Sequence, residues 1–471
     1  TITRKLHGQS VGGVKIEGFE TARKMLTVYE IDTVLLAMPT AQLEVHQRIF
    51  DLLTEMPVKV KWVPDLTNLI DGTADITELR DMDILDLLGR DPTKPDLELL
   101  GKTITEKIVL VTGAGGSIGS ELSRQIAAQA PAHLVILDIS EFAIYSLLQD
   151  LKKTHPSLAI TPIIGSIQDQ FFLNKVLDKF AIDTIYHAAA YKHVPLMEQN
   201  VMQCITNNAF GTRNMAEAAV AAQVKHFILV STDKAVNPTN FMGASKRLAE
   251  LVCQDLCKNT KLHAICDCAV WQRFGVFGVS SAAFQTADCR WRAGDGYASR
   301  CAPLFYDYTE AAQLVIQAGS LAKGGDIFVL DMGEPLNILD LAKKMITLSG
   351  KKPVLESANE IGADDILIRI TGLRAGEKMY EELCYSDNLT GTAHPRIMTT
   401  DDNSLPSEDL AALLNDVLDA IALNDHGKLF KIVRQVFNGV AHDVTSSDVF
   451  LSRRSDSSPN TVVPLAKRSR P

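Results

Sequence analysis

The sequence predicts an α/β protein with a doubly wound parallel sheet, preceded by a second, smaller α/β unit. Three observations support this prediction. A short apolar run at Ile108–Val111 leads into a glycine-rich turn and then into a helical stretch. Apolar strands and helical stretches alternate from there to about residue 260, and the same alternation occurs in brief before residue 75. Such alternation builds parallel sheets, whose strands are buried on both faces and are therefore apolar throughout.

The glycine-rich turn lies in the stretch KIVLVTGAGGSIGS, which begins at Lys107. Glycine lets the backbone turn tightly and come close to a pyrophosphate, because no Cβ stands in the way. The following helix, expected over Glu121–Ala130, would add free N–H groups and the positive end of its dipole. A strand, a glycine turn and a helix together predict a dinucleotide site. Its predicted contacts are Gly113, Gly116, Ser117, Ile118 and Gly119.

A carboxylate supports this Rossmann-type site. A second strand, His133–Leu137, ends in Asp138, which lies roughly 20 residues past the last glycine. An acid at this spacing binds the ribose hydroxyls of NAD and would repel the 2′-phosphate of NADP. NAD is therefore favoured, and NADP stays open. An ordinary tight turn would not explain three glycines and this acid together.

Composition bounds the class of protein. The 471 residues suffice for two or three domains, and 46% of them are hydrophobic and 22% charged, as in a globular protein with a sizeable core. The net charge of −10 argues against a general nucleic-acid or anionic-membrane binder. The sequence contains no run of about 20 apolar residues, so it predicts no membrane span. The eight cysteines form no disulfide framework and no paired metal-ligand spacing, so we expect a reducing cytosol and no metal.

Residues 1–75 are expected to form the small α/β domain. Its predicted helices and strands are Phe19–Glu30, Ile31–Met38, Ala41–Met56 and Val58–Val63. They carry no glycine fingerprint, which favours a docking or regulatory domain over a second cofactor site. Residues 76–104 are rich in acids and contain a polar break at Gly89–Pro92. We expect them to form a helical linker with a turn, packed on the next domain.

The rest of the nucleotide-binding half continues the alternation. Its predicted elements are Phe142–Thr154, Ala159–Ile164, Ile182–Ala188, Met202–Ala222 and His226–Ser231. Ligands bind beyond the carboxyl ends of the strands in such a sheet. Ser166 and Ile167 would therefore lie beside the adenine. Small side chains after the next strand would leave room for the cofactor or allow close packing. Further predicted cofactor contacts are Ala188, Ala189, Ala190, Lys192 and Asn208.

A hydroxyl, an acid and an amine follow the last of these strands. They are Thr232, Asp233 and Lys234, next to the expected nicotinamide position, and they suit acid–base catalysis. A helix then opens around Met242, and its Lys246 can reach the nicotinamide ribose. The charge of Lys246 would also lower the pKa of neighbouring acids. In isolation Asp233 and Lys234 would be a solvated surface pair, but their position in this fold favours catalysis.

Five stretches carry a resemblance to a known family. They are TGAGGSIGSEL from Thr112, HAAAYKHVPLME from His187, STDKAVNPTNFMGASKRLAE from Ser231, FVLDMGEP from Phe328 and TGLRAGEKMYEEL from Thr371. The chain resembles the extended short-chain dehydrogenase/reductase superfamily and, within it, the large nucleotide-sugar 4,6-dehydratases of capsule, O-antigen and glycoprotein-sugar synthesis. The resemblance covers most of 30–265 and 309–400. It implies a dehydratase domain over 105–400, with a cofactor core at about 107–265 and a substrate lobe.

The resemblance also implies an activity. It points to a lyase for surface polysaccharide synthesis that converts UDP-N-acetylglucosamine to the UDP-linked 4-keto-6-deoxy sugar, with tightly bound and recycled NAD(P). By resemblance, Thr232 orients the 4-hydroxyl, Asp233 is the acid and Lys234 is the C5 base. Most of the superfamily has Tyr-x-x-x-Lys, but Met242 stands at the tyrosine position here, as in the large dehydratases. Methionine cannot accept the 4-hydroxyl proton, whose acceptor stays open. The implied substrate contacts are Lys192, Arg273, Arg374, Gly376 and Glu377.

Two alternatives to this activity stay open. A UDP-sugar 4-epimerase is the alternative enzyme, which Met242 opposes because an epimerase needs tyrosine chemistry at C4. A nucleotide-binding protein without catalysis is the alternative outside enzymes, because residues 279–308 do not fit the family pattern. We expect 279–308 to be an out-of-frame translation, with a divergent loop or a Cys-ligated metal as alternatives. If the segment is as written, UDP-sugar binding is in doubt and the cofactor site survives.

The ends of the chain carry further expectations. Residues 401–450 should form a C-terminal helical region and 451–471 a disordered polar tail. The chain begins at Thr1 without Met, so we expect a fragment of a longer protein. We expect this chain to be cytoplasmic and homo-oligomeric, with no nucleic-acid partner. The parent protein is expected at the inner face of the membrane, through a missing N-terminal segment.

Overall fold

A computed structural model describes the chain in separate stretches. They are residues 8–18, 31–37, 43–54, 58–63, 80–81, 94–259, 265–269, 291–293, 308–331, 337–355, 365–370, 389–400, 404–437 and 439–440, with 21, 24–25, 28–29, 362 and 378. Within these residues no helix is both long and apolar enough to cross a lipid bilayer. The expected tail at 451–471 and nearly all of 279–308 lie outside the described residues.

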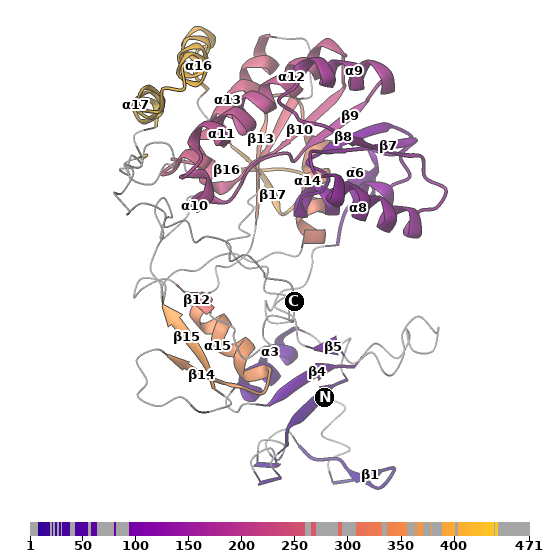
Figure 1. Ribbon diagram of the computed structural model, residues 1–471. Coiled ribbons are helices and arrows are strands. Elements are labelled where there is room, and N and C mark those ends of the chain that lie inside the picture. Colours follow the sequence, from indigo (N-terminus) through magenta and orange to yellow (C-terminus); the bar gives the residue numbers. More distant parts are fainter. Residues whose placement is uncertain are drawn as a thin grey trace, which may run out of the picture.

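A nine-stranded sheet forms the centre of the larger part of the molecule (Figure 1). Its strand order is β16-β17-β13-β11-β10-β9-β6-β7-β8. The seven strands from β13 to β8 are parallel, and β17 and β16 add an antiparallel edge. The strands are β6 Ile108–Thr112, β7 His133–Asp138, β8 Ile160–Ile164, β9 Thr184–His187, β10 His226–Val230, β11 Ile265–Ala269, β13 Ile327–Leu330, β16 Leu389–Gly391 and β17 Ile397–Thr400.

The strand order confirms the predicted doubly wound α/β fold. The chain runs outward from β6 through β7 to β8, and it then crosses back to β9 on the other side of β6. The direction of winding therefore reverses between β6 and β9. In open parallel sheets, ligands bind outside the carboxyl ends of the strands at this reversal. The glycine turn after β6 and the alanines after β9 both lie at this point.

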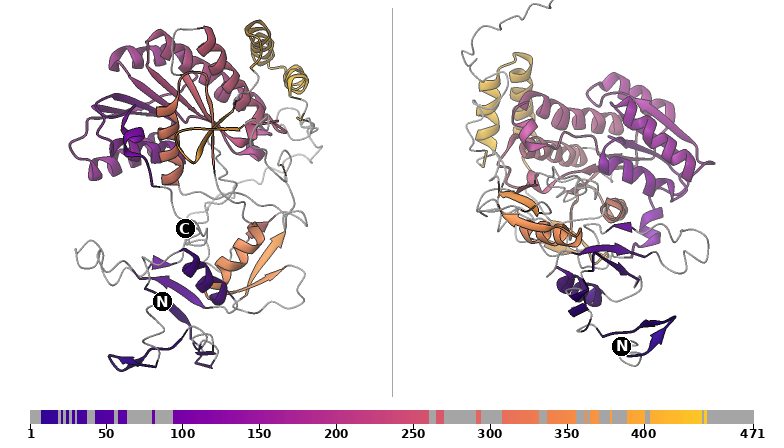
Figure 2. Two further views of the ribbon diagram at one scale, coloured as in Figure 1. Left: turned by 180° about the vertical axis from the view of Figure 1, so that it is seen from behind. Right: turned by 60° about the horizontal axis from the view of Figure 1, so that its bottom comes forward.

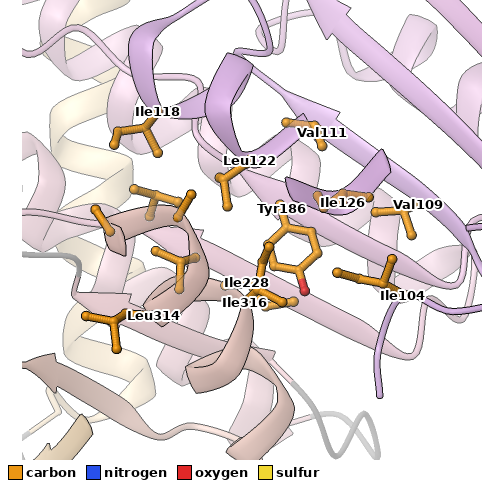
Figure 3. Close-up of a cluster of buried hydrophobic side chains, with 14 of the residues drawn as sticks. Ile104, Val109, Val111, Ile118, Leu122, Ile126, Tyr186, Ile228, Leu314 and Ile316 are labelled. Carbon is orange, nitrogen blue, oxygen red and sulfur yellow. The ribbon is translucent and has the colours of Figure 1, made fainter. Parts of the chain in front are cut away.

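Helices cover both faces of the sheet (Figures 1 and 2). They are α7 Ser117–Ala127, α8 Glu141–Thr154, α9 Gln170–Phe180, α12 Gly211–Ala221, α13 Phe241–Asn259 and α14 Tyr308–Leu321. Alternate residues of each strand point to opposite faces. On β6, Val109 and Val111 pack against α7 and α14, together with Tyr186 (Figure 3). Leu110 packs on the opposite face against α9 and α12. The central strands are thus buried on both faces, which explains their continuous apolar runs.

Two helices differ from the expected ones. Helix α7 begins at Ser117, four residues before the expected start, and ends at Ala127. Gly119 lies inside this helix. The position requires glycine, because the helix packs so closely on the glycine turn that a Cβ there would be 2.0 Å from the Gly113 carbonyl oxygen. The helix expected over Met202–Ala222 is α11 Val201–Ile205, a π-helical turn at Thr206–Phe210 and then α12. Its interruption lies beside the expected active site.

The N-terminal unit contains the predicted parallel strand pair. Strands β3 Thr33–Leu36 and β4 Lys59–Trp62 are parallel, with α3 Leu43–Leu53 between them in the chain. Short strands β1 Ser10–Val11, β2 Val14–Lys15 and β5 Arg80–Asp81 complete the described elements. The helix expected at Phe19–Glu30 falls largely outside the described residues.

This unit packs against the second half of the chain, which the sequence did not predict. Helix α15 Ile338–Leu348 places Leu348 in one buried cluster with Phe50 of α3 and Val60 of β4. Nearby, Lys344 Nζ lies 3.0 Å from the Asp51 carboxylate. Both views in Figure 2 place the N-terminal strands beside α15. Helix α15 also packs against a small sheet of β12 Trp291–Ala293, β15 Asp365–Ile370 and β14 Lys352–Leu355.

Two further segments pack on the large domain. The short helix α6 Leu97–Gly101 buries Leu100 and the following Ile104 in the core beside α14, as expected for the end of the linker. Helices α16 Ser407–Ala422 and α17 His426–Val436 pack on α13, where the rings of Phe241 and Phe430 meet edge to face at 4.7 Å. The C-terminal helices therefore support the helix on which the expected catalytic residues Met242 and Lys246 lie.

Candidate active site

The glycine turn after β6 is pressed against the end of β9. Gly113 has a φ of 66°, a conformation that favours glycine. A Cβ built on Gly113 would lie 2.6 Å from the backbone N and Cα of Ala189. Gly116 is the N-cap of α7 and has no side chain to cover the first N–H groups of the helix. The turn thus forms a backbone cradle at a helix N-terminus, as the motif predicts for a pyrophosphate.

Asp138 is held beside this cradle. Its Oδ2 accepts a hydrogen bond from the Gly115 N–H at 2.9 Å, and its Oδ1 accepts one from the Ser140 N–H at 2.9 Å. Each carboxylate oxygen can accept a further bond. The structure therefore brings together the predicted glycine turn and the predicted ribose-binding acid, and it fixes the orientation of the carboxylate.

The predicted adenine side of the site lies after β8. The Ser166 hydroxyl accepts a hydrogen bond from the Gln168 N–H at 3.1 Å. Ile167 is buried and packs onto Gly211 of α12, where a Cβ would lie 2.6 Å from the Ile167 Cδ1. The backbone at this strand end is thus fixed by local contacts. Ala188, Ala189 and Ala190 are all partly exposed, so they line the same edge, with Ala189 also serving the close approach of Gly113.

His187 is a functional candidate that sequence reasoning did not single out. It is fully buried at the end of β9, with Nδ1 2.6 Å from the Thr112 hydroxyl and Nε2 3.0 Å from the Thr212 hydroxyl. Burial and, to a lesser extent, the charge of Lys246 lower its pKa to about 3. The neutral ring therefore links β6, β9 and α12 by hydrogen bonds, close to the glycine turn after β6. Its position at the start of the HAAAYKH motif was the sequence feature that could have identified it as a candidate.

Thr232, Asp233 and Lys234 come together as predicted. Thr232 is the N-cap of a 3₁₀ turn at Asp233–Ala235, and its hydroxyl donates to the Asp233 Oδ1 at 2.7 Å. Lys234 Nζ lies 3.4 Å from the same oxygen. Asp233 is fully buried, and its Oδ2 has no hydrogen-bond partner among the described residues. A buried carboxylate oxygen without a partner is costly, so Asp233 is a candidate for binding or catalysis.

Helix α13 lies directly against this turn. A Cβ on Gly243 would be 2.0 Å from the Lys234 carbonyl oxygen. Lys246 is buried and its Nζ donates to the Val230 carbonyl at 2.7 Å, close to this turn. Met242 is also buried, in a cluster with Val194. Methionine thus occupies the tyrosine position as a packed apolar side chain.

Two predicted cofactor contacts have different surroundings. Asn208 is fully buried, and its carboxamide bonds the N–H and the carbonyl of Tyr191 at 2.8 and 2.9 Å and the Ser245 hydroxyl at 2.9 Å. It also accepts a bond from Asn207, so its donors and acceptors are all used within the protein. Lys192 is half-buried, which lowers its pKa, and it makes no hydrogen bond or ion pair in the described part of the chain. A direct cofactor contact therefore suits Lys192 better than Asn208.

The predicted substrate contacts Arg273, Arg374, Gly376 and Glu377 lie outside the described residues. Lys378, the next residue of the same motif, is described. Its Nζ donates to the Val236 carbonyl at 3.1 Å, one residue past the turn at Asp233–Ala235. Sequence reasoning did not name Lys378, although it belongs to the quoted motif. Among the described residues, no group of three or more possible metal ligands occurs.

Comparison with known proteins identifies relatives of the chain. A family model described as "Polysaccharide biosynthesis protein" matches residues 109–287 and 298–402. Capsular polysaccharide biosynthesis protein CapD of Staphylococcus aureus is 38% identical over 390 residues, which cover 81% of this chain and 62% of CapD. Probable polysaccharide biosynthesis protein EpsC of Bacillus subtilis is 39% identical over 376 residues, which cover 78% of this chain and 60% of EpsC. The matches thus span less than two thirds of either relative.

A solved structure, Pen from Bacillus thuringiensis, shares the fold. It is 24% identical, with a TM-score of 0.53, over 66% of this chain and 98% of Pen. The family match also bears on the segment expected to be out of frame. The match is interrupted at 288–297, inside 279–308, and both ends of that segment belong to matched ranges.

Proposed function

Because the chain belongs to the family of polysaccharide biosynthesis proteins whose model it matches, we propose that it is a nucleotide-sugar 4,6-dehydratase. The proposed reaction converts UDP-N-acetylglucosamine to UDP-2-acetamido-2,6-dideoxy-4-keto-hexose. The observation that carries this proposal is the buried Asp233 carboxylate, whose Oδ2 has no partner among the described residues. It lies beside Lys234 at the strand edge where the glycine cradle also lies.

The cofactor in this proposal is NAD, and NADP remains the second possibility. The residues present fit a dinucleotide, because a Cβ at Gly113 would fill the cradle and Lys192 offers a cation without a partner in the described part of the chain. Gly116 and the first turn of α7 would hold the pyrophosphate, and Asp138 the ribose hydroxyls. When bound, the nicotinamide supplies hydride acceptance from C4 and hydride return to C6, so that it is recycled.

The turn at Thr232–Lys234 is the proposed catalytic turn, and its residues would move the protons. The Thr232 hydroxyl would orient the 4-hydroxyl of the sugar. Once C4 is a ketone, the C5–H is acidic, and Lys234 would remove this proton in its neutral amine form. The Asp233 carboxylate would first accept the proton of the 4-hydroxyl as C4 becomes a ketone, and it would then donate this proton from Oδ2 to the departing 6-hydroxyl, which leaves as water. Lys246 would hold the nicotinamide ribose at this edge.

The sugar nucleotide would be held by the second half of the chain. An arginine such as Arg374 can bind a diphosphate in a bidentate fork that lysine cannot copy. Arg273 and Glu377 complete the proposed substrate contacts. The bond from Lys378 to the Val236 carbonyl supports this arrangement, because Lys378 follows Glu377 in the same motif and is held beside the proposed catalytic turn.

Product analysis tests the proposal. The chain is incubated with UDP-N-acetylglucosamine and NAD, and the product is examined by NMR and mass spectrometry. A 4-keto-6-deoxy product that has lost one water is expected. A product of unchanged mass with inverted C4 would instead establish a 4-epimerase. An unchanged substrate, with NAD bound, would contradict the dehydratase and indicate a nucleotide-binding protein with an impaired sugar site.

A further inference from the structure

Glu198 is a buried acid for which the proposed chemistry has no role. It follows the short helix α10 Val194–Met197 and is only 3% exposed. No cationic side chain among the described residues pairs with it. Its Oε1 accepts a hydrogen bond from the Phe241 N–H at 2.7 Å. Burial raises its pKa to about 7, although hydrogen bonds from the Phe241 and Met242 N–H groups lower it.

These two N–H groups are the first two of helix α13. The first N–H groups of a helix have no partner within it, and a side chain next to the helix start usually caps them. Asn240 does this for the third group, because its Oδ1 accepts from the Gly243 N–H at 2.7 Å. Glu198 lies 43 residues before Phe241 in the chain, so its bonds tie two distant segments together.

The two segments carry different parts of the candidate active site. Glu198 follows Lys192 in the stretch of chain after β9, and α13 carries Met242 and Lys246. The first turn of α13 touches the catalytic turn, because Gly243 lies against the Lys234 carbonyl. A shift of this helix start would therefore move the catalytic turn and the buried Lys246 together.

We propose that Glu198 is a positioning residue for the proposed dehydratase reaction. By accepting a hydrogen bond from the first N–H group of α13, it fixes the helix start against the Thr232–Lys234 turn. It thereby sets the rate of the chemical step more than the affinity for the sugar nucleotide. This inference rests on the proposed function, and it assigns a role to a residue that takes no part in the chemical step itself.

Three variants of the full chain test the proposal. Glu198→Ala removes the bond from the Phe241 N–H, and Glu198→Gln keeps a carbonyl oxygen in the same place. Asp96→Ala is the matched control, because Asp96 accepts from the N–H groups of Glu98 and Leu99 at the start of α6, away from the active site. The measurements are kcat and KM for UDP-N-acetylglucosamine, NAD affinity, and hydrogen exchange of the backbone amides at 241–246.

We expect Glu198→Ala to lower kcat by at least about tenfold with KM within about twofold, because small misplacements of catalytic groups are costly. Amide exchange at 241–246 should become faster, and Glu198→Gln should restore both properties. Asp96→Ala should leave kcat and exchange at 241–246 unchanged. Faster exchange with an unchanged kcat would overturn the proposal, because Glu198 would then be only a structural cap. Unchanged exchange would overturn it as well.

The same variants separate this proposal from the proposed function. If the unaltered chain turns over no UDP-sugar, the dehydratase proposal fails. Exchange at 241–246 and NAD affinity then decide the role of Glu198. Faster exchange and weaker NAD binding in Glu198→Ala, both restored in Glu198→Gln, would support positioning of α13. NAD affinity that stays unchanged in Glu198→Ala would contradict it.

Discussion

Gly243 lies so close to Lys234 that a Cβ atom on Gly243 would be 2.0 Å from the Lys234 carbonyl oxygen. Real Cβ atoms do not approach backbone oxygens this closely, so any other residue at this position would push α13 away from the turn at Asp233–Ala235. The close approach of α13 to this turn therefore depends on the absence of a side chain at Gly243.

Gly243→Ala is expected to lower turnover by about 100-fold, because it displaces the turn that carries Asp233 and Lys234. The overpacking should also lower the free energy of unfolding by about 1–3 kcal/mol. Gly427→Ala is the control, since its Cβ would have a nearest contact at 3.5 Å. Steady-state kinetics and urea unfolding measure both effects. Equal kinetics for the two variants would contradict the contact.

Asp233→Asn should remove activity without unfolding the protein. General acid catalysis contributes about 10²–10⁴-fold, and turnover should fall by that amount. The melting temperature should stay the same or rise, because removing a buried charge with an unpartnered oxygen offsets the loss of its ion pair with the partly exposed Lys234. Asp150→Asn, at an exposed partner of Arg124, should leave turnover unchanged. A fall in the melting temperature of Asp233→Asn would show that the charge stabilises the fold.

Gly113→Ala should abolish NAD binding. The new Cβ would lie 2.6 Å from the backbone of Ala189, and the φ of 66° would strain any L residue. Gly391→Ala is the control, because nothing lies within 4 Å of its Cβ. Calorimetric titration with NAD measures the difference. Comparable affinities in the two variants would remove the glycine turn from the cofactor site.

His187 should make stability depend on pH. Its pKa is about 6.5 in the unfolded chain and about 3 when folded, so the unfolded state binds the proton first as the pH falls. The stabilisation is fully present above about pH 6.5 and is lost between there and about pH 3. Between pH 6 and 5 the free energy of unfolding should fall by about 1.4 kcal/mol per pH unit through this group. Urea unfolding of His187→Asn should lack this contribution, and an identical slope would refute it.

The contact of the N-terminal unit with α15 should depend on apolar packing. Leu348→Ala removes a buried side chain that packs with Phe50 and Val60, and it should cost about 2–5 kcal/mol. Lys344→Ala breaks an exposed ion pair with Asp51 and should cost at most about 1 kcal/mol. Hydrogen exchange of the amides at 33–62 reports the difference. If the lysine variant had the larger effect, charge would hold this contact.

The sequence predicted the features that depend on neighbouring residues. The apolar run at Ile108–Val111, the glycine turn and Asp138 specify a strand, a turn and the next strand end, and the structure brings them together. Thr232, Asp233 and Lys234 are adjacent in the chain, so their grouping was already implied.

Contacts between distant segments could not be predicted in this way. The bond from Phe241 to Glu198, the neutral bridge of His187 and the packing of α15 on the N-terminal unit all depend on tertiary placement. The start of α7 was misplaced because glycine is a poor helix former, and its value here lies in close packing on Gly113.

Incubation with UDP-N-acetylglucosamine and NAD in deuterated water, followed by mass spectrometry and NMR, tests the central claim most directly. The proposed Lys234 base removes the C5 proton, and a solvent deuteron replaces it. The account predicts a product that has lost one water and carries one deuterium at C5. Lys234→Ala should not form this product. Loss of water without deuterium at C5, or a substrate left unchanged while NAD is bound, would contradict the account.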